Sequence, residues 1–162
     1  LAQLGALSTP THLLVCAGRA TVAVQNALCA MAAGPLRITF LPTLTQVDFD
    51  HLLWACDLNC VRGEDSVVRA LWAGKPLVWQ IYPQDDAAHI PKLDAFLEML
   101  DASPSLRAFH HAWNAAQSPA SSPALPAIDL AGWSLTVLQA RARLLQMDDL
   151  TTQILQFALK KQ

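Results

Sequence analysis

The sequence has few charged residues and no excess of basic ones. Only 15% of its 162 residues are charged, and 11 Lys and Arg stand against 13 Asp and Glu, for a net charge of −2. A protein that holds nucleic acid by its phosphates needs a surplus of positive charge, so we expect no nucleic-acid partner. Hydrophobic residues make up 53% of the chain, which excludes disorder for most of it and predicts a well-packed core.

Membrane spans and export signals are also lacking. The charge-free stretch from Ala20 to Leu36 is rich in alanine and contains Gly34 and Pro35, which makes it a poor membrane helix. No basic segment precedes an apolar run at the start, as a secretion signal requires. The chain opens on Leu1, inside a pattern of alanine and leucine. We therefore expect a piece of a longer cytoplasmic protein that has no membrane partner.

Metal-site and common catalytic motifs are missing as well. The cysteines lack paired C-x-x-C spacing and lie in apolar segments, so we expect reduced core residues at Cys16, Cys29, Cys56 and Cys60. Neighbouring His110 and His111 would point about 100° apart on a helix, which predicts surface or interfacial histidines and no metal site. No G-x-G-x-x-G, P-loop or G-x-S-x-G string is present. The tryptophans are expected as core anchors: Trp54, Trp72, Trp79, Trp113 and Trp133.

Short apolar runs alternate with helical patterns in the first half of the chain. The predicted strands are His12–Cys16, Leu36–Leu41, Leu58–Val61 and Leu77–Ile81, and the predicted helices between them are Arg19–Ala33, a helix around Phe49, Leu52 and Leu53, and Ser66–Trp72. This alternation is typical of a Rossmann-like α/β fold, a parallel sheet flanked by helices.

The second half of the chain is predicted to be helical. Helical patterns cover Lys92–Leu100, Leu106–Gln117 and the chain from Asp129 onward, and Ser118–Pro126 is a Pro- and Ser-rich surface loop. We expect one domain over residues 1–162, with residues 127–162 as its C-terminal helices.

The most polar loop follows the third predicted strand and is a candidate ligand site. In open α/β sheets ligands bind beyond the carboxyl ends of the strands, where a helix start presents N–H groups. Gly63 allows a sharp turn, Asp65 or Ser66 can cap the next helix, and the N–H groups with the Ser66 hydroxyl could bind a diphosphate. Arg62 and Glu64 complete the loop. The alternative is an ordinary helix cap beside a surface ion pair.

Two further loops belong to the same edge of the predicted sheet. The segment after the fourth strand contributes the hydroxyl of Tyr82 and the carboxyl groups of Asp85 and Asp86. The segment Pro42–Gln46 after the second strand could offer backbone groups to a base, with Phe49 as a flat apolar surface nearby. The alternative for Phe49 is a place in the core of its own helix.

Residues 49 to 86 carry a resemblance to a known family. The run FDHLLWACDLNCVRGEDSVVRALWAGKPLVWQIYPQDD closely resembles the signature of the bacterial elongation factor P arginine rhamnosyltransferases, the EarP family, and the agreement continues through His89 and Lys92–Phe96. The resemblance implies the carboxyl-terminal lobe of a two-lobed GT-B glycosyltransferase. Such enzymes transfer rhamnose from dTDP-β-L-rhamnose to one arginine of elongation factor P, with inversion at the sugar and without a cofactor.

The resemblance also assigns roles to individual residues of this chain. It implies that Asp65 and Ser66 contact the diphosphate and that Gln46, Arg62 and Tyr82 contact the nucleotide. Glu64 matches an acid that supports activity, whereas the principal catalytic aspartates lie in the missing N-terminal lobe. The chain alone is therefore expected to bind the donor without catalysing transfer.

One position departs from the family's pattern, and two alternatives remain open. The family usually has an aromatic residue packed on the thymine three positions before the glutamine, where this chain has Thr43, so Phe49 or the other lobe would have to replace it. The alternatives are a noncatalytic α/β interaction domain and a GT-B lobe for a different nucleotide sugar.

Overall fold

The structure is a computed structural model, and it describes residues 1–29, 36–84, 88–115 and 124–160. The predicted helix end at Gly34 and Pro35, the acids Asp85 and Asp86, and most of the 118–126 loop lie outside the described residues. The chain divides into two compact units, Leu1–Leu52 and Leu53–Gln162.

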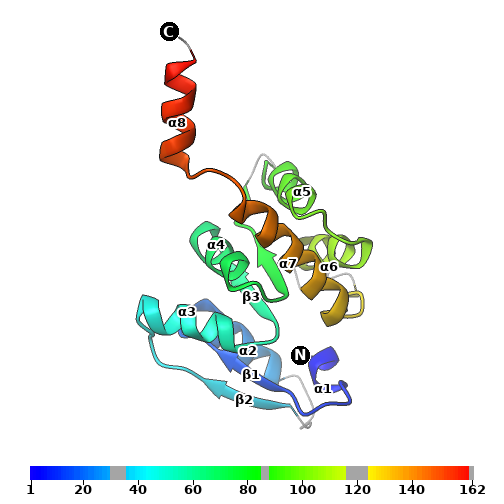
Figure 1. Ribbon diagram of the computed structural model, residues 1–162. Coiled ribbons are helices and arrows are strands. Elements are labelled where there is room, and N and C mark those ends of the chain that lie inside the picture. Colours follow the sequence, from blue (N-terminus) through cyan, green and yellow to red (C-terminus); the bar gives the residue numbers. More distant parts are fainter. Residues whose placement is uncertain (30–35, 85–87, 116–123, 161–162) are drawn as a thin grey trace. The chain divides into compact units, whose positions relative to one another are not determined.

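The first unit contains one pair of parallel strands (Figure 1). In chain order its elements are α1 (Ala2–Gly5), β1 (His12–Val15), α2 (Arg19–Cys29), β2 (Arg37–Phe40) and the start of α3 (Gln46–Ala55). Strands β1 and β2 pair in register from His12 opposite Arg37 to Val15 opposite Phe40. Two parallel strands need a crossover between them, and α2 lies in that connection.

A side-chain cap explains where α3 begins. The Thr45 hydroxyl accepts a hydrogen bond from the Asp48 N–H at 3.1 Å and donates one to the Asp48 carboxylate at 2.7 Å. This reciprocal pattern satisfies an N–H group that has no acceptor within the helix. Asp48, the acidic residue in the first turn of α3, also suits the positive end of the helix dipole.

The second unit repeats the strand–helix–strand arrangement and adds helices after it. Its elements are β3 (Asn59–Arg62), α4 (Glu64–Ala73), β4 (Leu77–Gln80), α5 (His89–Met99), α6 (Pro104–Ala115), α7 (Leu130–Leu145) and α8 (Leu150–Leu159). Strands β3 and β4 are parallel, with Asn59 opposite Leu77 and Arg62 opposite Gln80. The predicted α/β class with parallel strands is confirmed, and its strands form two sheets of two strands each in the described parts of the chain.

The core of the second unit lies between its sheet and helices α4 to α7. Fully buried side chains come from β4, α5, α6 and α7, and they include Leu77, Val78, Leu93, Leu97, Leu106, Trp133 and Val137. Gly74 ends α4 in the left-handed conformation with φ of 71°, as its place after the helix predicts. In α8 (red in Figure 1) the apolar side chains are exposed, among them Leu150, Ile154, Leu155, Phe157 and Leu159.

The edge of β4 that does not pair with β3 is hydrogen-bonded by two side chains of α6. His110 Nε2 accepts a hydrogen bond from the Trp79 N–H at 3.1 Å, and Asn114 Oδ1 accepts one from the Ile81 N–H at 2.9 Å. The Asn114 amide donates back to the Trp79 carbonyl at 2.9 Å. These bonds satisfy backbone groups that an unpaired strand edge would leave exposed.

The placement of His110 corrects the expectation of two surface histidines. His110 is buried and its Nδ1 bonds to the Leu106 carbonyl at 3.0 Å, whereas His111 is exposed beside Asp94. Burial, opposed by the bond to Leu106, lowers the pKa of His110 to about 4. A neutral ring with its proton on Nδ1 fits both hydrogen bonds, because Nε2 must then accept.

Two other burial expectations are wrong in part. Trp79 and Trp133 are core residues, but Trp54 and Trp72 are about half exposed, at 54% and 43%. The cysteines are free as expected, yet Cys29 and Cys60 are exposed and Cys16 and Cys56 are half-buried. Each of these residues lies in an apolar stretch, but a helix or strand at the surface buries only one of its faces, so the side chains on the other face stay exposed.

Candidate functional site

The candidate site lies where β3 and β4 end and α4 begins. The Gly63 N–H donates to the Gln80 carbonyl at 3.3 Å, and the Gly63 carbonyl accepts from the Trp79 indole N–H at 3.0 Å. Both backbone groups of Gly63, its N–H and its carbonyl, are thus hydrogen-bonded to residues of β4. Because β3 and β4 are parallel, their carboxyl ends deliver residues 62–66 and Tyr82 to one edge of the sheet.

Gly63 has the one backbone conformation in this loop that requires glycine. Its φ is 80°, a region that other residues rarely adopt. The Tyr82 ring lies directly against it, because a Cβ at position 63 would sit 2.9 Å from Tyr82 Oη and 3.0 Å from Cε2. The sharp turn expected at Gly63 is confirmed. The close approach of Tyr82 is a second reason why this position requires glycine.

Arg62 and Tyr82 form a cation–π pair. The Arg62 guanidinium carbon lies 4.4 Å from the centre of the Tyr82 ring, and the tyrosine is 46% exposed. This pair fixes a positive charge and an aromatic hydroxyl beside the start of α4. Two residues that the sequence places 20 positions apart are therefore neighbours.

Helix α4 begins two residues earlier than predicted. Gly63 is its N-cap and makes no side-chain cap, so Asp65 and Ser66 lie in the first helical turn and neither caps the helix. The Asp65 carboxylate instead pairs with Arg69 Nε at 2.9 Å, one turn further along. The Val67 N–H donates to the Gly63 carbonyl and so makes the first hydrogen bond of the helix. The Ser66 N–H precedes Val67, and N–H groups at that point of a helix have no acceptor within the helix.

Glu64 and Ser66 face different surroundings. Glu64 Oε1 accepts a hydrogen bond from Lys92 Nζ of α5 at 2.7 Å, which is the main reason that the pKa of Glu64 lies below its usual value. Ser66 is half-buried. Trp79 and Lys92 bond to this loop, and His110 and Asn114 bond to β4 beneath it. Sequence reasoning placed Trp79 in the core but did not predict any of these contacts. The spacing of His110 and Asn114, four residues apart on an apolar helix, was the available signal.

Gln46 and Phe49 belong to the first unit. They lie three residues apart in the first turns of α3, so they share one face of that helix. Gln46 is exposed, while Phe49 is half-buried, which fits neither a free aromatic surface nor a full core position. Their part in the candidate site stays a prediction.

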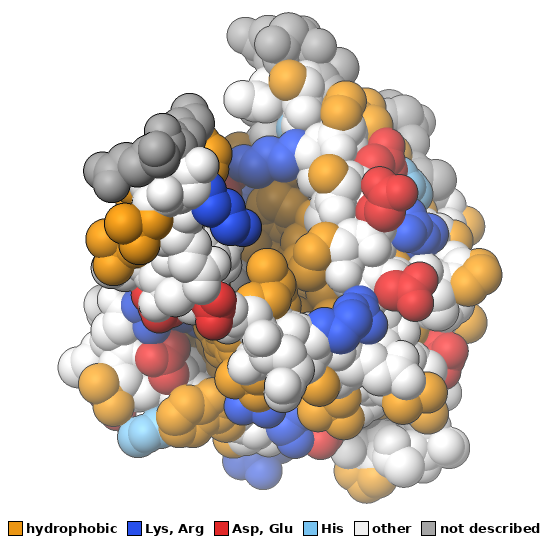
Figure 2. Space-filling view, turned by 45° about the horizontal axis from the view of Figure 1, so that its top comes forward, with side chains coloured by type: hydrophobic (Ala, Val, Ile, Leu, Met, Phe, Trp, Pro, Cys, Tyr) orange, Lys and Arg blue, Asp and Glu red, His pale blue; other side chains and the backbone are white. Residues whose placement is uncertain are grey.

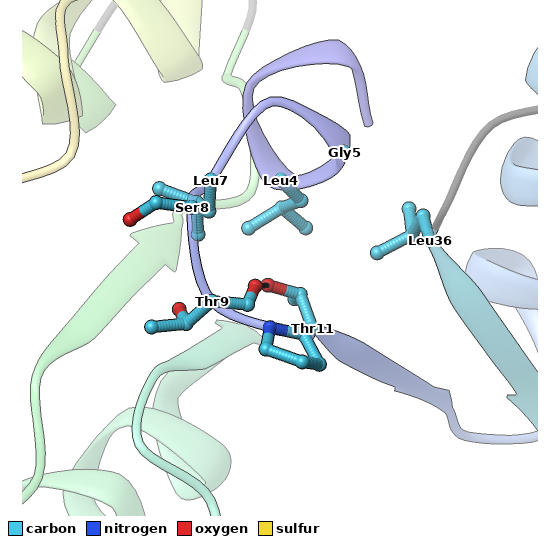
Figure 3. Close-up of a pocket in the computed structure, with 8 residues that line it drawn as sticks. Leu4, Gly5, Leu7, Ser8, Thr9, Thr11 and Leu36 are labelled. Atoms are coloured by element: carbon cyan, nitrogen blue, oxygen red, sulfur yellow. Dashed lines mark hydrogen bonds between the residues drawn. The ribbon is translucent and has the colours of Figure 1, made fainter.

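The first unit also has a pocket, which is not the candidate site. It has a volume of about 240 Å³ and lies between α1, the segment before β1, and Leu36 (Figure 3). Its lining is apolar at Leu4, Leu7 and Leu36, and its polar side chains are the hydroxyls of Ser8, Thr9 and Thr11. It lies at the amino ends of β1 and β2, whereas ligands of parallel α/β sheets bind at the carboxyl ends.

The face of the molecule seen in Figure 2 carries charges of both signs. Figure 2 shows basic, acidic and apolar side chains interspersed on the viewed face. No three or more His, Cys, Asp or Glu side chains gather into a metal-binding group in the described ranges. Likewise, none of the helices drawn in the described parts has the length and apolarity needed to cross a membrane.

This is an α/β protein whose neighbouring strand ends bring together a glycine turn, a helix start and a cation–π pair. Such an arrangement is suited to binding an anionic ligand. The chain belongs to the EarP family of elongation-factor P rhamnosyltransferases, whose model matches residues 1–159. The identification that residues 49–86 support is therefore confirmed.

Individual relatives agree with this assignment. The protein-arginine rhamnosyltransferase of Pseudomonas aeruginosa is 47% identical over 129 residues, or 71% of this chain, and that of Pseudomonas putida is 44% identical over 68% of it. A solved structure described as the basis for EarP-mediated arginine glycosylation of elongation factor EF-P covers 99% of this chain, with 29% identity and a TM-score of 0.68. The chain spans 34% of the length of the two Pseudomonas relatives and 55% of that solved chain.

Proposed function

We propose that this chain is the carboxyl-terminal, donor-binding lobe of a GT-B protein-arginine rhamnosyltransferase. Its ligand is dTDP-β-L-rhamnose, and the acceptor of the complete enzyme is an arginine of elongation factor P. Family membership supports the reaction class, and the relatives, which are protein-arginine rhamnosyltransferases, support the arginine and the sugar. The observation that carries the donor site is the meeting of Arg62, Gly63 and Tyr82 at the start of α4.

Each side chain has a task in this proposal. The helix start and the Ser66 hydroxyl bind the diphosphate, because N–H groups and the helix dipole favour an anion there. Arg62 adds positive charge, and Tyr82 contacts the nucleoside with its ring or hydroxyl. Asp65 can reach the diphosphate only through its backbone, since two anions repel. Gln46 and Phe49 would contact the base from α3.

Glu64 is assigned to the sugar rather than to the diphosphate. A carboxylate beside a diphosphate is repelled by it, so its presence fits a hydrogen bond to a rhamnose hydroxyl or support of the acceptor. In the complete enzyme Glu64→Gln should therefore lower turnover more than it lowers affinity for dTDP, which carries no rhamnose. Equal losses would make Glu64 a plain nucleotide ligand.

Transfer itself is assigned to the complete enzyme. A guanidinium stays protonated at neutral pH, so its attack on the sugar needs a positioned acid or base and a bound acceptor. The resemblance places the principal aspartates outside this chain. We expect no added deoxyhexose on elongation factor P by intact-mass spectrometry with this chain alone, and modification once the remainder of the enzyme is supplied in the same polypeptide.

Calorimetric titration with dTDP-rhamnose, dTDP-glucose and UDP-glucose tests the donor assignment. Preference for dTDP-rhamnose supports the proposal, and preference for UDP-glucose would favour a lobe for another nucleotide sugar. Binding of none of the three would favour a noncatalytic interaction domain. Ser66→Ala should weaken dTDP binding by about 1–3 kcal/mol, the range for a hydrogen bond to a charged group. A loss confined to folding stability would contradict the phosphate contact.

A further inference from the structure

The ammonium group of Lys92 lies next to the candidate site, in a half-exposed ion pair with Glu64. Besides its 2.7 Å bond to Glu64, Lys92 Nζ lies 5.8 Å from the centre of the Trp79 ring. That ring is itself held, because its N–H bonds to the Gly63 carbonyl and Phe96 packs edge-on against it at 5.0 Å between ring centres. Trp79 is 3% exposed, so it is a rigid base for the lysine.

Lys92 therefore links α5 to the Gly63 turn by two routes. One route runs through Trp79 to the Gly63 carbonyl, and the other runs through the carboxylate of Glu64, the next residue along the chain. The neighbouring His89 accepts a hydrogen bond at Nδ1 from the Gln84 N–H at 3.1 Å. The first turn of α5 thus contacts the segments that follow both β3 and β4.

The two acids at the start of α4 are paired with cations in different ways. Asp65 pairs with Arg69 on its own helix, whereas Glu64 is drawn to α5, 28 residues away in sequence. An acid at a helix start otherwise tends to bond to the N–H groups there, and the Glu64 N–H contributes to the lowered pKa of its own carboxyl group. Without the lysine, the full negative charge of this carboxylate would face an anionic ligand at the start of α4.

We propose that Lys92 is a positioning residue that holds the Glu64 carboxylate toward α5 and offsets its negative charge at the start of α4, where the diphosphate of the donor binds. This role rests on the proposed donor site. In this role Lys92 does not contact the reacting atoms. Lys92 acts by offsetting the charge of Glu64, whose repulsion of a diphosphate at close range would otherwise oppose binding.

Calorimetry with dTDP on the wild-type chain and four variants tests the proposal. Lys92→Met should weaken binding about tenfold, because an unpaired carboxylate then faces the diphosphate. Lys92→Arg keeps the charge and should stay within about threefold of wild type. Adding Glu64→Gln to Lys92→Met should restore most of the lost affinity. The matched control is Lys75→Met in the turn before β4, at the other end of the strand, where we expect wild-type binding.

The outcomes separate this role from the donor site itself. No binding by the wild-type chain would contradict the donor site and the role of Lys92 together. Binding by wild type with unchanged affinity in Lys92→Met would contradict the role of Lys92 alone. Failure of Glu64→Gln to restore affinity would show that Lys92 touches the phosphates directly, and would equally overturn a positioning role.

A second measurement needs no ligand. The side-chain carboxyl carbon of Glu64 can be followed by NMR as pH changes, in wild type and in Lys92→Met. Loss of the lysine should raise the pKa of Glu64, and Lys75→Met should leave it unchanged. An identical titration in wild type and Lys92→Met would contradict the pairing on which the proposal depends.

Discussion

The two units of the chain share a strand–helix–strand pattern but differ in how much they bury. In the described part of Leu1–Leu52, Val15 is the one buried side chain, and α2 has none. In Leu53–Gln162, buried side chains come from both strands and from α4 to α7. The same local pattern thus yields a packed core only where further helices cover the sheet. The residues that need rigid placement, Arg62, Gly63 and Tyr82, belong to the packed unit.

The largest difference between the units should appear on truncating a buried leucine. Leu97 in α5 is fully buried, whereas Leu14 in β1 is half-buried. Leu97→Ala should lower the free energy of unfolding by about 2–5 kcal/mol, and Leu14→Ala by about 1 kcal/mol, because its site loses less burial and leaves no closed cavity. Urea denaturation measures both. Equal losses would contradict the difference in packing.

Acid should destabilise the second unit through His110. Its pKa is about 4 in the folded chain against an ordinary 6.5, so the unfolded chain takes up the proton first as pH falls. The free energy of unfolding should therefore decline as pH drops from about 6.5 to 4, by roughly 3 kcal/mol in total. Denaturation at several pH values measures the slope.

A histidine on the surface provides the control for that slope. His111→Gln, at the exposed neighbour, should change this slope only slightly, because His111 is the smallest of the causes that act on the pKa of His110. His110→Gln should flatten it, in addition to lowering stability throughout. A slope that survives His110→Gln would assign the acid sensitivity to other groups.

Adding a methyl group at Gly63 should disturb the site as well as the backbone. Gly63→Ala forces a left-handed conformation and places Cβ against the Tyr82 ring, for a cost of about 1–3 kcal/mol. The Tyr82 ring resonances should shift. Gly18 offers a matched control in the first unit, because its φ is 121° and a Cβ there meets nothing within 4 Å. Gly18→Ala should cost stability without moving Tyr82.

The smallest effect is expected at the Asp65–Arg69 pair on α4. The pair is four residues apart and largely exposed on the Asp65 side. Arg69→Gln should change the free energy of unfolding by about 0.5 kcal/mol or less, and less still in high salt. A loss above about 2 kcal/mol would mean that Arg69 has a structural role that the pair does not explain.

Strand and helix positions were predictable because local periodicity sets them. The four strands and the helices after them lie within a few residues of their predicted places, and Gly63 was predicted as a turn point. Burial was less predictable, as Trp54, Trp72 and His110 show. Whether an apolar or polar side chain is covered depends on which distant element packs against it, and His110 meets β4 from 31 residues away.

The candidate site was predictable to the level of its loops but not of its contacts. Parallel strand ends were expected to bring residues 62–66 and Tyr82 together, and the Gly63–Tyr82 contact agrees with that. The bond from Lys92 to Glu64 depends on the path of α5, which no local pattern determines. Asp65 or Ser66 was expected to cap α4, but the helix begins at Glu64, and residues inside the first turn cannot act as its cap.

Amide NMR of the chain titrated with dTDP tests the central claim most directly. If the loop after β3 holds the diphosphate, the amides of Gly63 to Ser66 and of Tyr82 should shift together and saturate with one affinity. Amides around the pocket at Leu4 and Leu36 should stay in place. Saturating dTDP that leaves Gly63 to Ser66 and Tyr82 unmoved would contradict the donor site.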